Sequence, residues 1–278
     1  EGWSRDALNW LYDDYFGARQ DTLWRDNARR TLPALMTCTG QLVCGEDLGM
    51  VPPCVPPVLD ELGILGLRIQ RMPHEEGEFG RPNRYPYATV CSPSCHDTTT
   101  TRAWYETDRH RRARYAHQVL GMQGDGALAS SFPPPMAYRV EHVEEGSGAQ
   151  RRRTSIGSVG VEDLGGVADG SGDTGFVERQ HPPPDKCEPH VMRAIVRQHM
   201  ASPSALAVFP AQDLLALEAS YAQRPAEEET INDPTNNRHY WRFRLHVRLE
   251  DMLANSEWLA DIRELVNESG RQEGKLTV

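Results

Sequence analysis

Two carboxylates of this chain, Glu46 and Asp97, stand where a strand end would aim a side chain into a cleft. Glu46 follows the apolar segment 41–44 and one glycine, and Asp97 follows His96 after the apolar segment 87–91. A carboxylic acid that is partly desolvated in such a cleft has a raised pKa, so it can act first as general acid and then as general base. Two strand-end carboxylates in one cleft are also what a glycosidase needs to manage an oxocarbenium-like transition state. The spacing therefore favours glycosidase-type chemistry.

Each of these residues also has a plainer interpretation. A single glutamate such as Glu46 is more often an N-cap or a salt-bridged loop residue, and Asp47 beside it could orient a neighbour or cap a turn. His96 and Asp97 could belong to a metal site or cap a helix that starts within 98–101. Ser-His-Asp hydrolysis is a weak alternative, because the chain has no G-x-S-x-G motif.

Four short apolar segments alternate with helical patterns, which predicts βα units, a parallel sheet and an α/β fold. The functional residues of parallel sheets collect at the C-terminal ends of the strands, in TIM barrels and doubly wound sheets alike. Four βα units make half of an eight-fold barrel, and no Gly-rich phosphate loop follows a strand, which disfavours a nucleotide-binding sheet. The strands are expected at 41–44, 66–69, 87–91 and 206–209, and the polar pairs after them are Glu46-Asp47, Gln70-Arg71, His96-Asp97 and Gln212-Asp213.

Helical periodicity fills most of the remaining chain. Two N-terminal helices are expected, the first with Leu8, Leu11, Tyr12 and Tyr15 on one face and the second with Trp24, Ala28, Leu32 and Leu35 turned inward. Later helices are expected over 54–62, 98–120, 188–200, 214–221 and 257–268.

Aromatic and Arg side chains are suited to binding sugars, although core packing is the commoner role for an aromatic ring. The candidates are Arg68, Arg71, Trp104, Tyr105, Tyr240 and Trp241.

The bulk composition excludes several classes of protein. A net charge of -10 argues against general nucleic-acid binding, and a mean hydropathy of -0.61 with no long apolar run argues against a membrane span. Six cysteines without zinc-ligand spacing indicate free thiols in a reducing compartment, the cytosol or a plastid stroma. The first residue is Glu1, not Met, so we expect an excerpt of a longer sequence.

Five stretches, taken together and in order, resemble glycoside hydrolase family 77, the 4-α-glucanotransferases (amylomaltases and disproportionating enzymes). They are 44–52, 66–73, 92–97, 209–215 and 231–236. The residue sequences of 68–73 and 238–242 are similar to the plant and algal cytosolic form of the family. The resemblance implies the C-terminal half of a (β/α)8 TIM barrel. Residues 1–120 would hold strands five to seven and residues 188–278 strand eight with the C-terminal helices. A Gly-, Ser- and Pro-rich insertion at 121–187 is expected to be disordered.

The resemblance also implies roles for individual residues. Glu46 would be the acid/base and Asp97 the carboxylate that stabilises the transition state. The predicted substrate-binding residues are His96, Asp47, Gln212, Asp213 and Asn232. The family's nucleophilic Asp lies in an Arg-x-Asp-His-type motif that does not occur in this chain, so we expect the nucleophile upstream of Glu1 and no activity from these 278 residues alone.

The implied reaction transfers glucosyl or α-1,4-glucan units with retention. Maltose or malto-oligosaccharides would be the donors and a glycogen-like or heteroglycan chain the acceptor, without metal or other cofactor. The implied location is the cytosol, with a plastid as the alternative. Two other functions stay open: a non-catalytic or vestigial glucan-binding fragment, and an α-amylase-like hydrolase.

Overall fold

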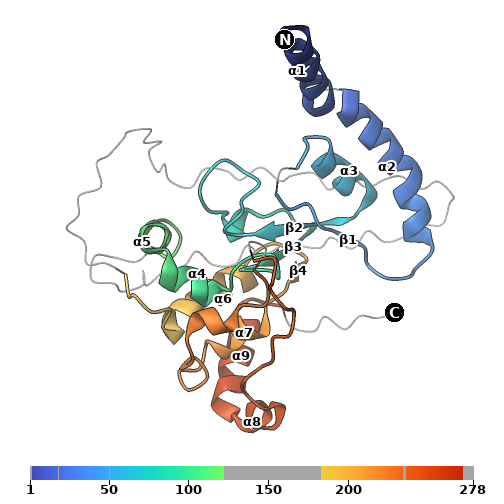
Figure 1. Cartoon of the computed structure of the whole chain (residues 1–278). Helices are drawn as coiled ribbons and strands as arrows, with labels where there is room; N and C mark the ends of the chain where they lie inside the picture. The colour runs from blue at the N-terminus through green and yellow to red at the C-terminus, as the bar shows by residue number, and fades with distance from the viewer. Residues whose placement is uncertain (1, 18, 50, 122–182, 234–235, 272–278) are drawn as a thin grey trace, which may run out of the picture.

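The computed structural model describes residues 2–17, 19–49, 51–121, 183–233 and 236–271. Within these ranges the chain forms an α/β fold around one sheet, in which every strand runs parallel to its neighbour in the order β1-β2-β3-β4 (Figure 1). The predicted parallel sheet of βα units is thus confirmed. The strands are β1 (Cys44–Gly45), β2 (Leu65–Ile69), β3 (Thr89–Ser92) and β4 (Leu206–Ala207).

The two outer strands are shorter than the sequence indicated. Strands were expected at 41–44 and 206–209, but β1 and β4 each pair through two residues only. Both lie at an edge of the described sheet and have one neighbouring strand there. The apolar residues beside them therefore continue as extended loop, and Val208 donates its backbone N–H to the Cys91 carbonyl oxygen at 2.9 Å beyond the end of β4.

The helices follow the predicted pattern with two corrections and one addition, a short helix over 249–254 that was not predicted. The helix expected over 98–120 is broken in two, because Asp108 leaves the helical conformation and its carboxylate caps the second helix by accepting the Arg111 N–H at 3.0 Å. The helix expected over 214–221 lies earlier and is shorter. The helices are α1 (Gly2–Gly17), α2 (Arg19–Thr37), α3 (Val55–Leu62), α4 (Thr101–Thr107), α5 (Arg109–Gln118), α6 (Pro189–Met200), α7 (Ala211–Leu215), α8 (Leu249–Ala254) and α9 (Ser256–Glu268), with 3-10 turns η1 (Pro82–Arg84) and η2 (Ala226–Glu229).

The main hydrophobic core is formed by the helices α4 to α7 and α9 and the loops beside them, which gather on one side of the sheet (Figure 1). Alternation along the strands sorts the side chains between the two faces. Cys91 is buried on the helix side, with its Sγ 3.1 Å from Ser202 Oγ, whereas its neighbour Val90 faces the opposite side and lines a cleft together with Leu67. One face of the sheet is therefore covered by helices, and the other face borders the cleft.

The N-terminal helices contribute little to this core. In Figure 1, α1 extends away from the sheet at the end of α2. The expectation that α2 turns its apolar side inward is wrong for Leu35, which is 59% exposed, and Leu8, Leu11, Tyr12 and Tyr15 of α1 are exposed as well. α1 packs against α2, with the rings of Tyr15 and Trp24 5.7 Å apart, and α2 packs against α3, so neither N-terminal helix adds a residue to the main core.

Most of the predicted insertion at 121–187 lies outside the described residues. Its last residues are described: Cys187 is buried in the main core, and Asp185 forms an ion pair with Arg112 of α5. Among the described helices, none has the length and apolar character that crossing a membrane requires.

Candidate active site

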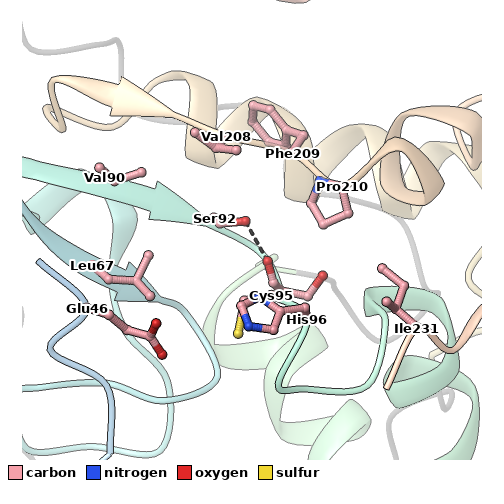
Figure 2. Close-up of a pocket in the computed structure, with 11 residues that line it drawn as sticks. Glu46, Leu67, Val90, Ser92, Cys95, His96, Val208, Phe209, Pro210 and Ile231 are labelled. Atoms are coloured by element: carbon pink, nitrogen blue, oxygen red, sulfur yellow. Dashed lines mark hydrogen bonds between the residues drawn. The ribbon is translucent and has the colours of Figure 1, made fainter. Parts of the chain in front are cut away.

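A cleft of about 400 Å³ lies where the strands end (Figure 2). The open face of the sheet forms its floor, and the loops after β3 and β4 form its walls. Two of the predicted site residues, Glu46 and His96, contribute to the lining. The lining residues are Glu46, Leu67, Val90, Ser92, Ser94, Cys95, His96, Val208, Phe209, Pro210 and Ile231.

Glu46 projects from the end of β1 toward the side of the cleft that holds Cys95 and His96 (Figure 2). The sequence predicted a partly desolvated carboxyl group here. That expectation is wrong for this chain, because Glu46 is exposed. Since β1 is an edge strand of the described sheet, nothing described covers the carboxylate on its outer side.

Asp47 points the other way and is buried, with 4% of its surface exposed. Its Oδ1 accepts the Leu67 backbone N–H at 2.5 Å, and its Oδ2 accepts from Arg68 Nη1 at 3.0 Å. A Cβ at position 66 would lie 2.8 Å from Asp47 Oδ2, so the close approach requires the glycine that stands there. These contacts hold the end of β1 against β2 and thereby fix the direction in which Glu46 projects.

His96, Asp97 and Asn232 lie together on the far side of the cleft. His96 Nε2 is 3.2 Å from Asp97 Oδ2, and Asn232 Nδ2 donates to Asp97 Oδ1 at 3.4 Å. Both members of the His-Asp pair remain accessible, with side chains 56% and 42% exposed. The structure therefore brings together three predicted site residues from two distant loops, with polar atoms free to meet a ligand.

Arg71 anchors the loop that carries this pair. Its guanidinium donates to the Thr99 carbonyl oxygen at 2.6 Å, to Thr98 Oγ1 at 3.3 Å and to the Pro93 carbonyl oxygen at 3.5 Å. It also lies over the ring of Trp104, 5.1 Å from the centroid. Burial lowers the Arg71 pKa to about 10. The sequence suggested Arg71 as a sugar partner, but in the structure its donors serve the loop.

Asp213 holds the same loop from inside the protein. Its Oδ2 accepts from Thr101 Oγ1 at 3.0 Å and from Ser94 Oγ at 3.4 Å, so it joins α7 to both ends of the His96-Asp97 loop. The neighbouring Gln212 donates to the Glu229 carbonyl oxygen at 3.4 Å. Asp213 and Gln212 are buried, so the prediction that they contact sugar stays a prediction, and their geometry favours a supporting role.

The burial of Asp213 gives the loop a pH dependence that can be measured. Desolvation raises the pKa of Asp213 to about 6, against the opposing hydrogen bond from Thr101. An acid whose pKa is higher in the folded state binds more protons folded than unfolded between the two pKa values. The contribution of Asp213 to the free energy of unfolding should therefore fall as pH rises from about 4 to about 6. In Asp213→Asn this contribution should be lost, so the curve of unfolding free energy against pH should differ in slope from that of the wild type between pH 4 and 6 when urea unfolding is followed at pH 4, 5, 6 and 7.

The exposed Asp6→Asn serves as the control and should keep the wild-type dependence. Parallel curves for wild type and Asp213→Asn would contradict the assignment of this titration to Asp213.

One part of the site could not be found from the sequence. Arg102 Nη1 donates to Glu229 Oε1 at 2.5 Å, and Arg102 Nη2 donates to the carbonyl oxygens of Ala222 and Arg224 at 2.9 and 3.1 Å. Both charged side chains are buried, at 5% and 3% exposure. The pair joins α4 to η2, three residues before Asn232. The partners are 127 residues apart in the chain, so no local pattern points to them.

The aromatic candidates divide into two groups. Trp104 and Tyr105 are buried in the main core, so their role is packing. Tyr240 and Trp241 are exposed, and the ring of Trp241 lies 5.8 Å from that of His96.

Within the described part of the chain, no three His, Cys, Asp or Glu residues are arranged to hold a metal ion.

Comparison with known proteins gives consistent matches. A family model described as 4-alpha-glucanotransferase matches residues 2–250. The 4-alpha-glucanotransferase DPE2 of rice (Oryza sativa subsp. japonica) is 44% identical over 269 residues, which is 96% of this chain and 22% of the rice protein. A 4-alpha-glucanotransferase of Chlamydia muridarum is 29% identical over 120 residues, 41% of this chain and 23% of that protein. The chain thus spans about a fifth of the length of these relatives.

A solved structure supports the fold. The amylomaltase from Streptococcus agalactiae in complex with acarbose superposes with a TM-score of 0.51 at 16% identity, covering 87% of this chain and 34% of that one. The sheet described above is therefore similar to part of the amylomaltase fold.

Proposed function

Because the chain belongs to glycoside hydrolase family 77, the 4-alpha-glucanotransferases, we propose that it carries the acid/base side of a glucan-transfer site. The reaction is transfer of glucosyl or α-1,4-glucan units with retention, from maltose or malto-oligosaccharides to a glycogen-like or heteroglycan acceptor. The observation that carries this proposal is the cleft at the strand ends, which Glu46 and His96 line from opposite sides. The cytosol is the proposed location.

The fold proposal is that β1 to β4 are strands five to eight of a (β/α)8 barrel. The parallel order and the alternation with helices support it. So does the open face of the sheet, which carries apolar side chains where a solvent-facing sheet would carry polar ones. Val208 is 52% exposed and Leu206 40% exposed on this face, beside Leu67 and Val90. The remaining strands of a barrel would cover these residues and would also enclose Glu46.

In this mechanism Glu46 protonates the departing glycosidic oxygen while a carboxylate outside these 278 residues attacks the anomeric carbon. The glycosyl ester that forms is then opened by a sugar hydroxyl of the acceptor, whose proton Glu46 takes. Enclosure of Glu46 by a complete barrel would exclude water from its carboxyl group and hold it against the glycosidic oxygen that it must protonate. Transfer exceeds hydrolysis when acceptor sugar occupies the cleft in place of water.

The second part of the proposal assigns roles to the His96-Asp97 pair and its neighbour Asn232. Asp97 stabilises positive charge at the anomeric centre, and His96 and Asn232 bind hydroxyl groups of the adjoining sugar. Asn232 orients Asp97 through their hydrogen bond. The three buried predicted residues, Asp47, Gln212 and Asp213, are proposed to position the loops and strands that carry the exposed ones.

A chimera tests the function. This chain would replace the matching region of the rice relative, and the purified protein would be incubated with maltose and glycogen. The expected products are free glucose and lengthened glycogen chains, with newly formed linkages in the α configuration by NMR. An α-amylase-like hydrolase would release glucose without lengthening the acceptor.

The 278-residue chain by itself provides the comparison and should release no glucose. Glucose release by the chain alone, or an inactive chimera that folds like the rice protein by circular dichroism and melting temperature, would contradict the proposal.

A further inference from the structure

We propose that Trp241 forms an additional sugar subsite at the rim of the cleft, on which a glucose ring of a malto-oligosaccharide stacks as the chain leaves the cleft past His96. This inference rests on the proposed function and names a contact of the same site. It extends the cleft beyond its lining residues, among which Trp241 does not appear.

The first support is the position of the indole ring. The centroids of Trp241 and His96 are 5.8 Å apart, and the ring planes are tilted by 55°. His96 lines the cleft, so a ligand that meets the imidazole is within one sugar unit of the indole. Trp241 is nevertheless 59% exposed, so the contact with His96 leaves most of the indole surface open.

The second support is that the segment carrying Trp241 is tied to the cleft wall. His239 Nε2 lies 2.7 Å from the carbonyl oxygen of Ile231, a lining residue, and the His239 N–H donates to the Asn236 carbonyl oxygen at 2.9 Å. On the other side of Trp241, the Arg242 N–H donates to the Tyr240 carbonyl oxygen at 2.8 Å. The backbone that carries the indole is thus tied to the cleft wall, which lowers the entropy cost of ordering this segment when a ligand binds.

The third support is the match between the indole and an α-glucan. A glucose ring has an apolar face of C–H groups and a rim of hydroxyls, so it fits a flat aromatic surface with polar groups at its edge. His96 supplies a ring nitrogen at that edge. Trp3 is even more exposed, at 79%, but it lies on α1 and outside the cleft lining. Both tryptophans are exposed, but of the two it is Trp241 that lies beside a residue of the cleft.

The test uses the 278-residue chain and maltoheptaose, and its first measurement needs no substitution. The chain is oxidised with N-bromosuccinimide with and without maltoheptaose, and oxidation at each tryptophan is read by peptide mass spectrometry. Trp241 should be protected by the sugar, while Trp3 in the same molecule should oxidise at an unchanged rate.

The second measurement is the dissociation constant by calorimetry. Trp241→Ala should weaken maltoheptaose binding about tenfold, Trp241→Phe should retain affinity within about threefold, and Trp3→Ala should have no effect. A wild type that binds, with equal affinity in Trp241→Ala and no protection of Trp241, would overturn this inference and leave the proposed function standing. A wild type that does not bind maltoheptaose would count against the proposed glucan cleft and against this subsite with it.

Discussion

Replacing Glu46 by Gln in the chimera with the rice relative should lower the rate of glucose release from maltose by about 10²–10⁴-fold. That is the range that a positioned general acid/base contributes. Glutamine keeps the size and the hydrogen-bonding reach of the side chain, but it cannot give a proton to the leaving oxygen. Binding of maltoheptaose should change by less than about threefold, because the loss falls on the transition state rather than on the bound sugar.

Glu76→Gln is the matched control, since Glu76 is exposed and lies outside the cleft lining. It should leave both the rate and the affinity unchanged. An undiminished rate in Glu46→Gln would remove Glu46 from the chemistry, and a loss confined to affinity would make it a binding residue.

Replacing Arg102 by Met should cost about 3–5 kcal/mol of unfolding free energy, the usual cost of leaving one partner of a buried ion pair uncompensated. Glu229 would keep its place beneath the Asn232 loop with 3% of its side chain exposed. Burial already raises the pKa of Glu229 while Arg102 opposes that rise, so loss of the guanidinium should leave the carboxyl group protonated over a wider pH range. Denaturant unfolding at pH 7 measures the loss.

The double variant Arg102→Met/Glu229→Met separates the lost ion pair from lost packing. Removing both charges should recover much of the stability that the single variant loses, because neither charge of the pair is then left buried without its partner. Arg193→Met provides a control at a more exposed ion pair, with Asp261, where the loss should stay below about 1 kcal/mol. Equal losses in the single and double variants would show that packing, and not the charge pair, sets the stability.

Much of the fold followed from local sequence signals. Alternating apolar strands and helical patterns predicted the parallel sheet, and polar pairs after the strands predicted where the cleft would lie. The end of α3 was also predicted correctly. Gly63 adopts a φ of 69°, a left-handed conformation that favours glycine, and the helix ends there as expected. These features depend on a few neighbouring residues, and that is why the sequence alone reveals them.

The remaining features depend on partners that the sequence does not show. Asp108 could have continued a helix, but the tertiary arrangement uses its carboxylate as a cap. Asp47 and Asp213 follow strands as Glu46 does, and only the three-dimensional packing decides that they are buried while Glu46 faces the cleft. The ion pair of Arg102 with Glu229 joins segments that are far apart in the chain. Periodicity can assign such residues to an element but not to a contact.

The most direct test of the central claim, that Glu46 is the acid/base of a retaining glucan transferase, is azide rescue of a Glu46→Ala chimera supplied with α-maltosyl fluoride. Fluoride leaves without protonation, so the glycosyl-enzyme still forms, and azide attacks it without needing a base. Our account predicts that azide restores turnover and yields α-maltosyl azide, in which the configuration of the donor is retained. Turnover that azide does not change, or a β-maltosyl azide product, would contradict the assignment of Glu46.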